Sequence, residues 1–165
     1  MAAESSFDVV SKVDRAEVDN AIQQTRKELQ QRFDFKGTNA TIEWSGDLTI
    51  EVRANAEQRL KAAIDVFKER CVKRQVSLKA LTVGEPKPAA GSTFKSEIAV
   101  NQGIATEKAR EIVKYVKGAN LKAVQVAIQS DQLRVSAKSK DSLQEVIQLL
   151  KEKDFGIPLQ FTNYR

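Results

Sequence analysis

ATIEWSGDLTIEV, residues 40–52, alternates apolar and polar side chains on both sides of the central Ser45-Gly46-Asp47. Alternation of this kind is typical of strands with one buried face, because successive side chains of a strand point to opposite sides. The central glycine predicts a hairpin turn. The same pattern recurs in VQVAIQSDQLRVSA, residues 124–137, around Ser130-Asp131. The chain therefore contains two predicted β-hairpins, far apart in the sequence.

A helix is predicted on each side of the first hairpin. Residues 14–33 carry apolar side chains at steps of three and four, and Asp14 with Glu17 has the spacing of a capping box. The second helix is predicted to begin at Asn55, whose side chain would cap it. Short apolar runs at the two ends predict strands over Phe7–Lys12 and Leu78–Val83.

The second hairpin is flanked in the same way. The predicted elements are a strand over Phe94–Val100, a helix over Thr106–Gly118, a helix capped by Asp141 and a strand over Leu159–Tyr164. The order βαββαβ is that of the ferredoxin-like arrangement, in which a four-stranded antiparallel sheet carries both helices on one face. The predicted fold class is therefore α+β, with two ferredoxin-like units that repeat the architecture and not the sequence.

The segment Gly84–Ser92 holds two of the three prolines, flanked by glycines, and no apolar periodicity crosses it. These properties are typical of an extended linker. The predicted units therefore cover residues 1–83 and 93–165, joined by a linker over residues 84–92. Each unit is near the size at which a single core is marginal, so we expect the units to pack together. An exchange of strands between them is left open.

Composition excludes several classes of function. The 165 residues include no histidine and one cysteine, Cys71. Most hydrolytic mechanisms use a histidine base, and a Cys/His zinc site needs several of these ligands. The sequence places no pair of carboxylates together either. The chain is therefore not expected to be an enzyme or to hold a metal or a cofactor, and Cys71 is interpreted as a small buried apolar residue.

The expected location is the cytoplasm, without a membrane partner. No apolar run approaches the ~20 residues that cross a bilayer, and the first residues do not resemble a signal peptide. A single cysteine also fits a reducing compartment.

The two hairpins present different outward faces. In the second hairpin, the outward positions include Gln125, Arg134 and Lys138, which can bind a phosphate and hydrogen-bond a base or ribose. The first hairpin presents mixed charges, among which Arg53 is the candidate for binding an anion. Residues 92–165 carry 12 basic and 8 acidic side chains. This excess favours an anionic partner, although it is also ordinary solubilising charge.

The segment Arg32-Phe33-Asp34-Phe35-Lys36-Gly37 has two interpretations. As a helix end, Phe33 continues the apolar stripe, Lys36 favours the negative end of the helix dipole and Gly37 makes the turn. As a binding segment, Arg32 and Lys36 lie near an anion and Phe35 is an exposed stacking ring.

The base-stacking platform of RNA-recognition domains is not predicted, because the second strand of each hairpin contains no aromatic residue. Three phenylalanines on the other strands fit either a stacking surface or the core: Phe7, Phe94 and Phe161.

Four segments, in this order, resemble the YajQ family over nearly the whole chain. They are Ser6-Phe7-Asp8-Val9-Val10-Ser11, Arg32-Phe33-Asp34-Phe35-Lys36-Gly37, Gln102-Gly103-Ile104 and Gln160-Phe161-Thr162-Asn163-Tyr164-Arg165. The resemblance implies two ferredoxin-like units similar to RNA-recognition domains, and a nucleotide-binding role in the bacterial cytoplasm. It implies no catalytic residues.

The leading hypothesis is a non-enzymatic nucleotide-binding protein that senses a nucleotide or cyclic dinucleotide. The candidate site residues are Arg134, Lys138, Arg53, Gln125, Lys36, Phe35 and Arg32. An RNA- or DNA-binding protein that uses both sheet faces is the first alternative, and steep salt dependence would favour it. A protein-interaction adaptor with exposed strands is the second.

Overall fold

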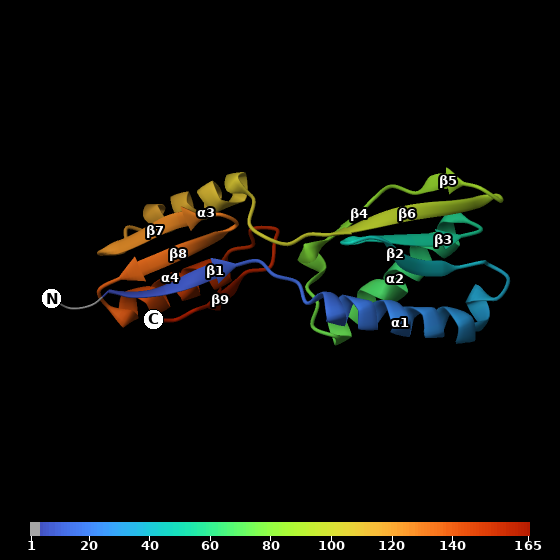
Figure 1. Cartoon of the computed structure of the whole chain (residues 1–165), viewed down its shortest axis with the longest axis horizontal. Coiled ribbons are helices and arrows are strands. Elements are labelled where there is room, and N and C mark those ends of the chain that lie inside the picture. Colours follow the sequence, from blue (N-terminus) through green and yellow to red (C-terminus); the bar gives the residue numbers. More distant parts are fainter. Residues whose placement is uncertain (1–3) are drawn as a thin grey trace. The chain divides into compact units, whose positions relative to one another are not determined.

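The computed structural model describes residues 4–165 (Figure 1). Its strands are β1 (Ser5–Val10), β2 (Thr41–Gly46), β3 (Thr49–Ala54), β4 (Leu81–Val83), β5 (Lys87–Ala89), β6 (Thr93–Val100), β7 (Val124–Gln129), β8 (Gln132–Ala137) and β9 (Gln160–Thr162). Its α-helices are α1 (Arg15–Gln31), α2 (Glu57–Lys73), α3 (Thr106–Gly118) and α4 (Lys140–Glu152), and two 3-10 helices are η1 (Phe33–Phe35) and η2 (Leu78–Ala80). The predicted α+β class is confirmed.

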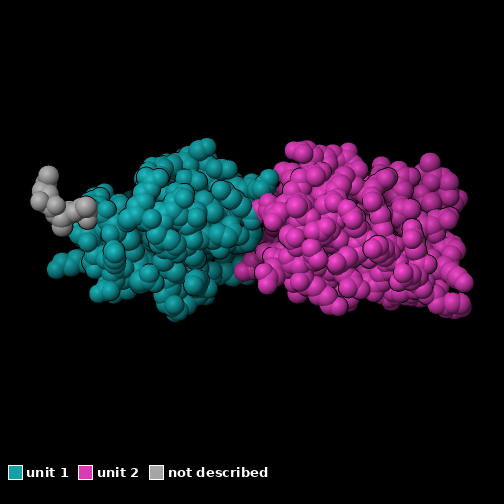
Figure 2. Space-filling model, turned by 60° about the horizontal axis from the view of Figure 1, so that its bottom comes forward, with its two compact units in different colours: residues 1–12, 102–165 teal, residues 13–101 magenta. Residues whose placement is uncertain are grey.

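The chain forms two compact units, coloured separately in Figure 2. Unit 1 comprises the described residues up to Lys12 together with Gln102–Arg165, and unit 2 comprises Val13–Asn101. The chain therefore passes between the units twice, at residues 12–13 and 101–102. This division differs from the linear one expected from the sequence, in which the first and last halves each formed a unit.

The sheet of unit 1 has the strand order β7-β8-β1-β9, with antiparallel neighbours. One face of this sheet contributes Phe7, Val9, Leu133 and Val135 to a core that also holds Ile112 of α3 and Val146 of α4. Both helices therefore cover the same face, as the ferredoxin-like arrangement requires. The alternating residues point to the other face, which the helices leave open.

The sheet of unit 2 has the strand order β2-β3-β6-β4, and β5 also pairs with β6. Its core joins Ile50, Val52 and Ile98 of the sheet to Ile22 of α1 and Leu60 of α2. In this sheet β6 lies between the hairpin and the last strand, which is the position that β1 has in unit 1. The two first strands of the predicted repeats have therefore exchanged sheets.

The segment expected to be a linker is part of an edge strand of unit 2. β4 pairs with β6 through Val83 and Ile98, and β5 pairs with the same strand through Lys87 and Lys95. The residues between, Gly84-Glu85-Pro86, form a kink in this edge, where a proline that cannot donate a hydrogen bond is tolerated. A side chain at Gly84 would place its Cβ 3.0 Å from the carbonyl oxygen of Glu97, so this close approach favours glycine.

Local signals predicted the helix starts with mixed success. The carboxylate of Asp14 accepts a hydrogen bond from the Ala16 amide at 3.0 Å and caps α1, as predicted. The prediction for Asn55 was wrong, because α2 follows Ala56 and the side-chain Nδ2 of Asn55 donates to the carbonyl oxygen of Gly37. The prediction for Asp141 was also wrong, because α4 follows Ser139, whose hydroxyl oxygen accepts the Asp141 amide.

Candidate functional site

The open face of the unit 1 sheet brings together part of the predicted site. The register sets Asp8 of β1 opposite Arg134 of β8, and Arg134 opposite Ala127 of β7. In the next row, Ser6, Ser136 and Gln125 lie opposite one another. This face therefore combines hydroxyl, amide and guanidinium groups, as the alternation of the second hairpin predicted.

An ion pair with a buried carboxylate lies at the centre of this face. Arg134 donates from Nε to Oδ1 of Asp8 at 3.0 Å, and Asp8 is only 1% exposed. Asn163 donates from Nδ2 to the second carboxylate oxygen at 2.8 Å. Burial alone would raise the pKa of Asp8, but the hydrogen bonds from Arg134 and Asn163 and the charges of Arg134 and Arg165 outweigh it and lower that pKa. Asp8 therefore remains ionised and fixes the guanidinium of Arg134.

A hollow of 680 Å³ lies at the β7 edge of this face. Its volume is within the range of about 300–1,000 Å³ that is typical of ligand sites. Arg134, Gln125 and Ser136 line it from the sheet. Lys117 and Asn120 line it from the end of α3 and the loop that follows. Asp8 accepts the hydrogen bond from Nε of Arg134. Within residues 4–165, the two terminal guanidinium nitrogens of Arg134 have no hydrogen-bond partner. These two nitrogens therefore remain available to an anion.

Three of the predicted site residues belong to unit 1, but only two of them share the hollow. Gln125 and Arg134 line it, whereas Lys138 follows the end of β8 and is exposed outside the lining. The four others, Arg32, Phe35, Lys36 and Arg53, belong to unit 2. Sequence reasoning also missed Asp8, Lys117 and Asn120. An acidic residue within the apolar run of β1 was the available signal for Asp8.

The open face of the unit 2 sheet carries a row of cations beside a row of carboxylates. Arg53, Lys95 and Lys87 lie opposite one another across β3, β6 and β5. Glu43, Glu51 and Glu97 form the adjacent row. Glu51 accepts from Arg53 Nε at 3.0 Å, which raises the pKa of Arg53, and it lies 3.9 Å from Lys95 Nζ. The carboxylates therefore compensate these cations.

The structure of the segment Arg32–Gly37 agrees fully with neither of its two interpretations. α1 ends at Gln31, and η1 turns the next residues so that Phe35 is 4% exposed and joins the core, whereas Phe33 is 86% exposed. Both the burial expected for Phe33 and the exposure expected for Phe35 were therefore wrong. Arg32 binds Asp34 with two hydrogen bonds of 3.1 and 2.9 Å. Lys36 Nζ lies 5.9 Å from the centre of the Phe33 ring.

The other candidate groups serve the two cores. Phe7 is fully buried and packs edge-on against Phe161 at 5.9 Å between ring centres, and Phe94 packs against the unit 2 core. Cys71 is fully buried, and burial raises its pKa to about 12.

The helices within residues 4–165 all lack the length and apolarity needed to cross a membrane. The same residues contain no group of three or more Cys, Asp and Glu that could hold a metal.

The fold and this site define a class of protein with two ferredoxin-like units and a polar, partly cationic sheet face. A model of the family described as "Nucleotide-binding protein YajQ-like" matches residues 5–165. The chain belongs to this family.

Curated relatives cover the whole chain. A protein of Acidothermus cellulolyticus is 59% identical over 98% of this chain and 99% of its own length. Another from Rhodococcus opacus is 56% identical over 99% of each chain, and one from Thermobifida fusca is 52% identical over 100% of each. All three carry the name "Nucleotide-binding protein".

Proposed function

We propose that this protein binds a nucleotide on the open face of the unit 1 sheet, without converting it chemically. The observation that carries the proposal is the hollow at the β7 edge, where Arg134, Gln125 and Ser136 meet Lys117 and Asn120. Membership of the nucleotide-binding family supports the choice of ligand.

The phosphate would bind at Arg134. The carboxylate of Asp8 holds the guanidinium in place from one side, so its two terminal nitrogens are oriented before the ligand arrives. Lys117 supplies a second cation from the same hollow. Asp8 neutralises part of this charge, and the sequence lacks the pattern of a phosphate-binding loop, Gly, four residues, then Gly-Lys-Ser/Thr. We therefore expect modest affinity.

The base and ribose would be bound by the neutral groups. Gln125 and Asn120 each offer an amide that both donates and accepts, and Ser136 offers a hydroxyl. No aromatic side chain lines this hollow, so recognition of the base would rest on hydrogen bonds along its edge. This chemistry fits a mononucleotide or a cyclic dinucleotide better than a stacked single strand.

Calorimetric titration tests the proposal with ATP, GTP, cyclic di-GMP and a short single-stranded RNA, each at two salt concentrations. We expect saturable binding of a mononucleotide or cyclic dinucleotide, weakened about tenfold or more by Arg134→Ala, since a charge-assisted hydrogen bond contributes about 1.5–3 kcal/mol. Arg53→Ala, on the sheet of unit 2, is the matched control and should leave the affinity unchanged.

The other outcomes are distinct. Binding lost in Arg53→Ala and kept in Arg134→Ala would move the site to unit 2. Heat with RNA alone that collapses at the higher salt would replace the proposal with nucleic-acid binding. No heat with any of the four ligands would remove both and favour a protein-interaction adaptor.

A further inference from the structure

The kink between β4 and β5 is a β-bulge at the edge of the unit 2 sheet. Both strands pair with β6, and the three edge residues between them, Gly84-Glu85-Pro86, face only two residues of β6, Ser96 and Glu97. The Gly84 amide donates to the carbonyl oxygen of Glu97 at 2.8 Å, so the two other residues of the kink lie together opposite Ser96. Bulges redirect the side chains around them and are common beside active sites.

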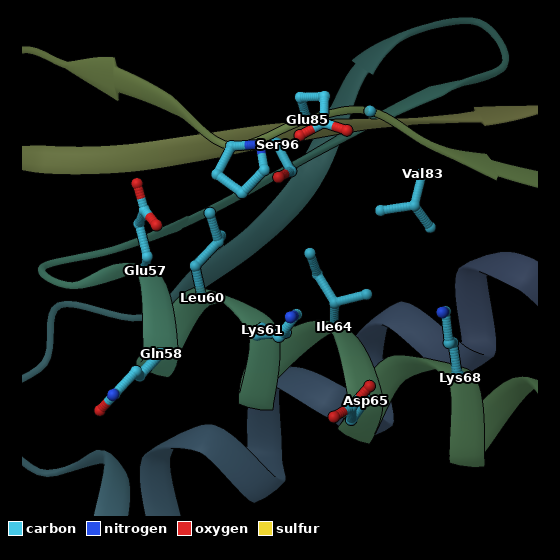
Figure 3. A pocket seen from close by; sticks show the side chains of 12 residues that line it. Glu57, Gln58, Leu60, Lys61, Ile64, Asp65, Lys68, Val83, Glu85 and Ser96 are labelled. Atoms are coloured by element: carbon cyan, nitrogen blue, oxygen red, sulfur yellow. The ribbon is translucent and has the colours of Figure 1, made fainter.

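A second hollow lies where this bulge faces α2. It has a volume of 610 Å³, which is typical of ligand sites (Figure 3). Leu60 and Ile64 of α2 line one side of it, and Val83 and Pro86 of the strand edge line the other. Its walls are therefore apolar, and we call it the α2 groove.

A buried hydroxyl without a partner lines the α2 groove. Ser96 lies near the middle of the groove in Figure 3 and is 1% exposed, and within residues 4–165 its Oγ has no hydrogen-bond partner. It occupies an inward position of β6, between Phe94 and Ile98, which pack in the core. An apolar residue would be expected there, because an unpaired buried hydroxyl costs free energy. The bulge and this hydroxyl lie at the same point of the sheet, and together they indicate a site built for a polar group of a ligand.

The charges around the α2 groove favour an uncharged occupant. The polar residues of α2 that line it are Glu57, Gln58, Lys61, Asp65 and Lys68. Opposite charges alternate along the helix in this set, so no part of the wall has a single sign. Glu85 lies beside Ser96 in Figure 3, but its side chain is exposed and solvent screens its charge. A charged group placed at Ser96 would lose its hydration without gaining a buried partner of opposite sign, which is costly.

We propose that the α2 groove binds a small uncharged molecule with an apolar body and one hydroxyl or carbonyl group. The apolar body would contact Leu60, Ile64 and Val83. The polar group would form a hydrogen bond with Oγ of Ser96, because a serine hydroxyl both donates and accepts. This site belongs to unit 2, is separate from the proposed nucleotide site and does not depend on it.

Titration of the isotope-labelled full chain at pH 7, followed by amide NMR shifts, tests the proposal. The probes are 1-adamantanol, 1-adamantanecarboxylate and 1-adamantylammonium, which share one rigid hydrocarbon cage and differ in charge. The alcohol should shift the amides of Ile64, Gly84 and Ser96, and each charged probe should bind about tenfold or more weakly. Equal or tighter binding of either charged probe, or no shift of these amides with the alcohol, would overturn the proposal.

Ser96→Ala separates a binding role from a purely structural one. The free protein should melt about 2–4 °C higher, because the hydroxyl that is removed has no partner. Adamantanol should bind about three- to tenfold more weakly, because one hydrogen bond is lost. Thr25→Val removes a buried hydroxyl that donates to the Ala21 carbonyl oxygen, and as the control it should neither raise the melting temperature nor change the affinity. An unchanged affinity in Ser96→Ala would contradict the proposal.

Val83→Phe tests the position of the ligand without changing Ser96. Val83 pairs with Ile98 and faces α2, so a larger side chain there would fill part of the groove and weaken adamantanol binding about tenfold or more. Thr82→Phe is the matched control, because neighbouring side chains of a strand point to opposite faces, and it should leave the affinity unchanged. Equal binding by Val83→Phe and the unchanged protein would place the probe outside the groove.

Glu85→Gln and Lys68→Gln test the absence of charge recognition. Each should change the affinity for adamantanol by less than about twofold, since surface charges contribute little to the binding of an uncharged ligand. A larger loss in either variant would assign the groove to a charged ligand and overturn the proposal. A nucleotide that displaces adamantanol from the groove would also refute it, while the unit 1 proposal would remain testable by Arg134→Ala.

Discussion

Asp8 and Arg134 face each other across β1 and β8, and the guanidinium donates from Nε to the carboxylate at 3.0 Å. The carboxylate is almost completely buried, whereas the arginine side chain is 34% exposed. One partner thus belongs to the interior of the sheet and the other reaches its surface. The pair links the exchanged strand β1 to the residue on which the proposed nucleotide site depends.

Asp8→Asn should destabilise the protein at pH 7, by about 1–3 kcal/mol, because the ion pair is lost and Arg134 keeps no anionic partner. The effect should depend on pH. The folded pKa of Asp8 is lowered, so its contribution to stability is present above the unfolded value of 3.8 and is lost as the pH falls through the folded pKa. Denaturant unfolding of both proteins between pH 7 and pH 2 measures this.

The difference between Asp8→Asn and the unchanged protein should therefore shrink on acidification. Glu51→Gln on unit 2 is the matched control, since the Glu51 side chain is 15% exposed whereas that of Asp8 is 2% exposed, and it should cost less at every pH. A difference for Asp8→Asn that stays constant with pH would contradict the role given to its charge.

Phe33→Ala and Phe35→Ala should change the free energy of unfolding by very different amounts, although only one residue separates them. Phe35 is buried in the unit 2 core, so its truncation should cost about 3–5 kcal/mol. Phe33 is 86% exposed, and its truncation should change the free energy of unfolding by less than about 0.5 kcal/mol. Urea denaturation measures both, and equal losses would contradict the turn made by η1.

Gly103→Ala should destabilise unit 1 by about 1–3 kcal/mol, because φ is +83° and the new Cβ would lie 2.9 Å from an Asp131 carboxylate oxygen. Gly118→Ala is the matched control. It ends α3 with no atom within 4 Å of the added Cβ, so it should leave stability unchanged or raise it by up to about 1 kcal/mol. Thermal unfolding should therefore show a loss of stability for Gly103→Ala and none for Gly118→Ala, and similar losses would be evidence against the strain at Gly103.

Cys71 should be inert toward thiol reagents in the folded protein. Its thiol is fully buried with a pKa of about 12, so thiolate forms only when the chain opens. Labelling with a chromogenic disulfide at pH 8 should be slow in buffer and fast in denaturant. Between pH 9 and 12 the unfolded chain loses this proton and the folded one keeps it, so the contribution of Cys71 should lower stability as pH rises. Cys71→Ala should remove that part of the alkaline loss.

Local patterns predicted the strands of both hairpins and the open-face positions of Gln125 and Arg134, because alternation with period two depends only on neighbouring residues. The exchange of β1 and β6 could not be predicted, since Phe7–Val10 and Phe94–Val100 are both short apolar strands and their choice of sheet depends on tertiary contacts. The exposures of Phe33 and Phe35 were inverted for a related reason. α1 stops at Gln31, and the helical phase that placed Phe33 in the stripe no longer applies.

The site was less predictable than the fold. Arg134 was predicted from its outward position. Its hydrogen bond to Asp8, and the hydrogen bond from Asn163 to Asp8, join residues more than a hundred positions apart. Lys117 lies in the last turn of α3 and Asn120 follows the helix, and the position of that helix end in space cannot be read from the helix periodicity. Asn55 has the right residue type for a helix cap, yet its amide instead holds the turn at Gly37. In each case a long-range contact outweighed a local preference.

The chain returns to unit 1 at residue 102, so neighbouring strands of the unit 1 sheet are synthesised at widely separated times. The ribosome makes β1 first, but its sheet neighbours β8 and β9 are made only after all of Val13–Asn101 has been synthesised. Unit 2 can therefore complete its sheet while Phe7 and Val9 still lack their neighbours. Until the last strand is synthesised, these apolar side chains remain available to a chaperone or to a neighbouring nascent chain.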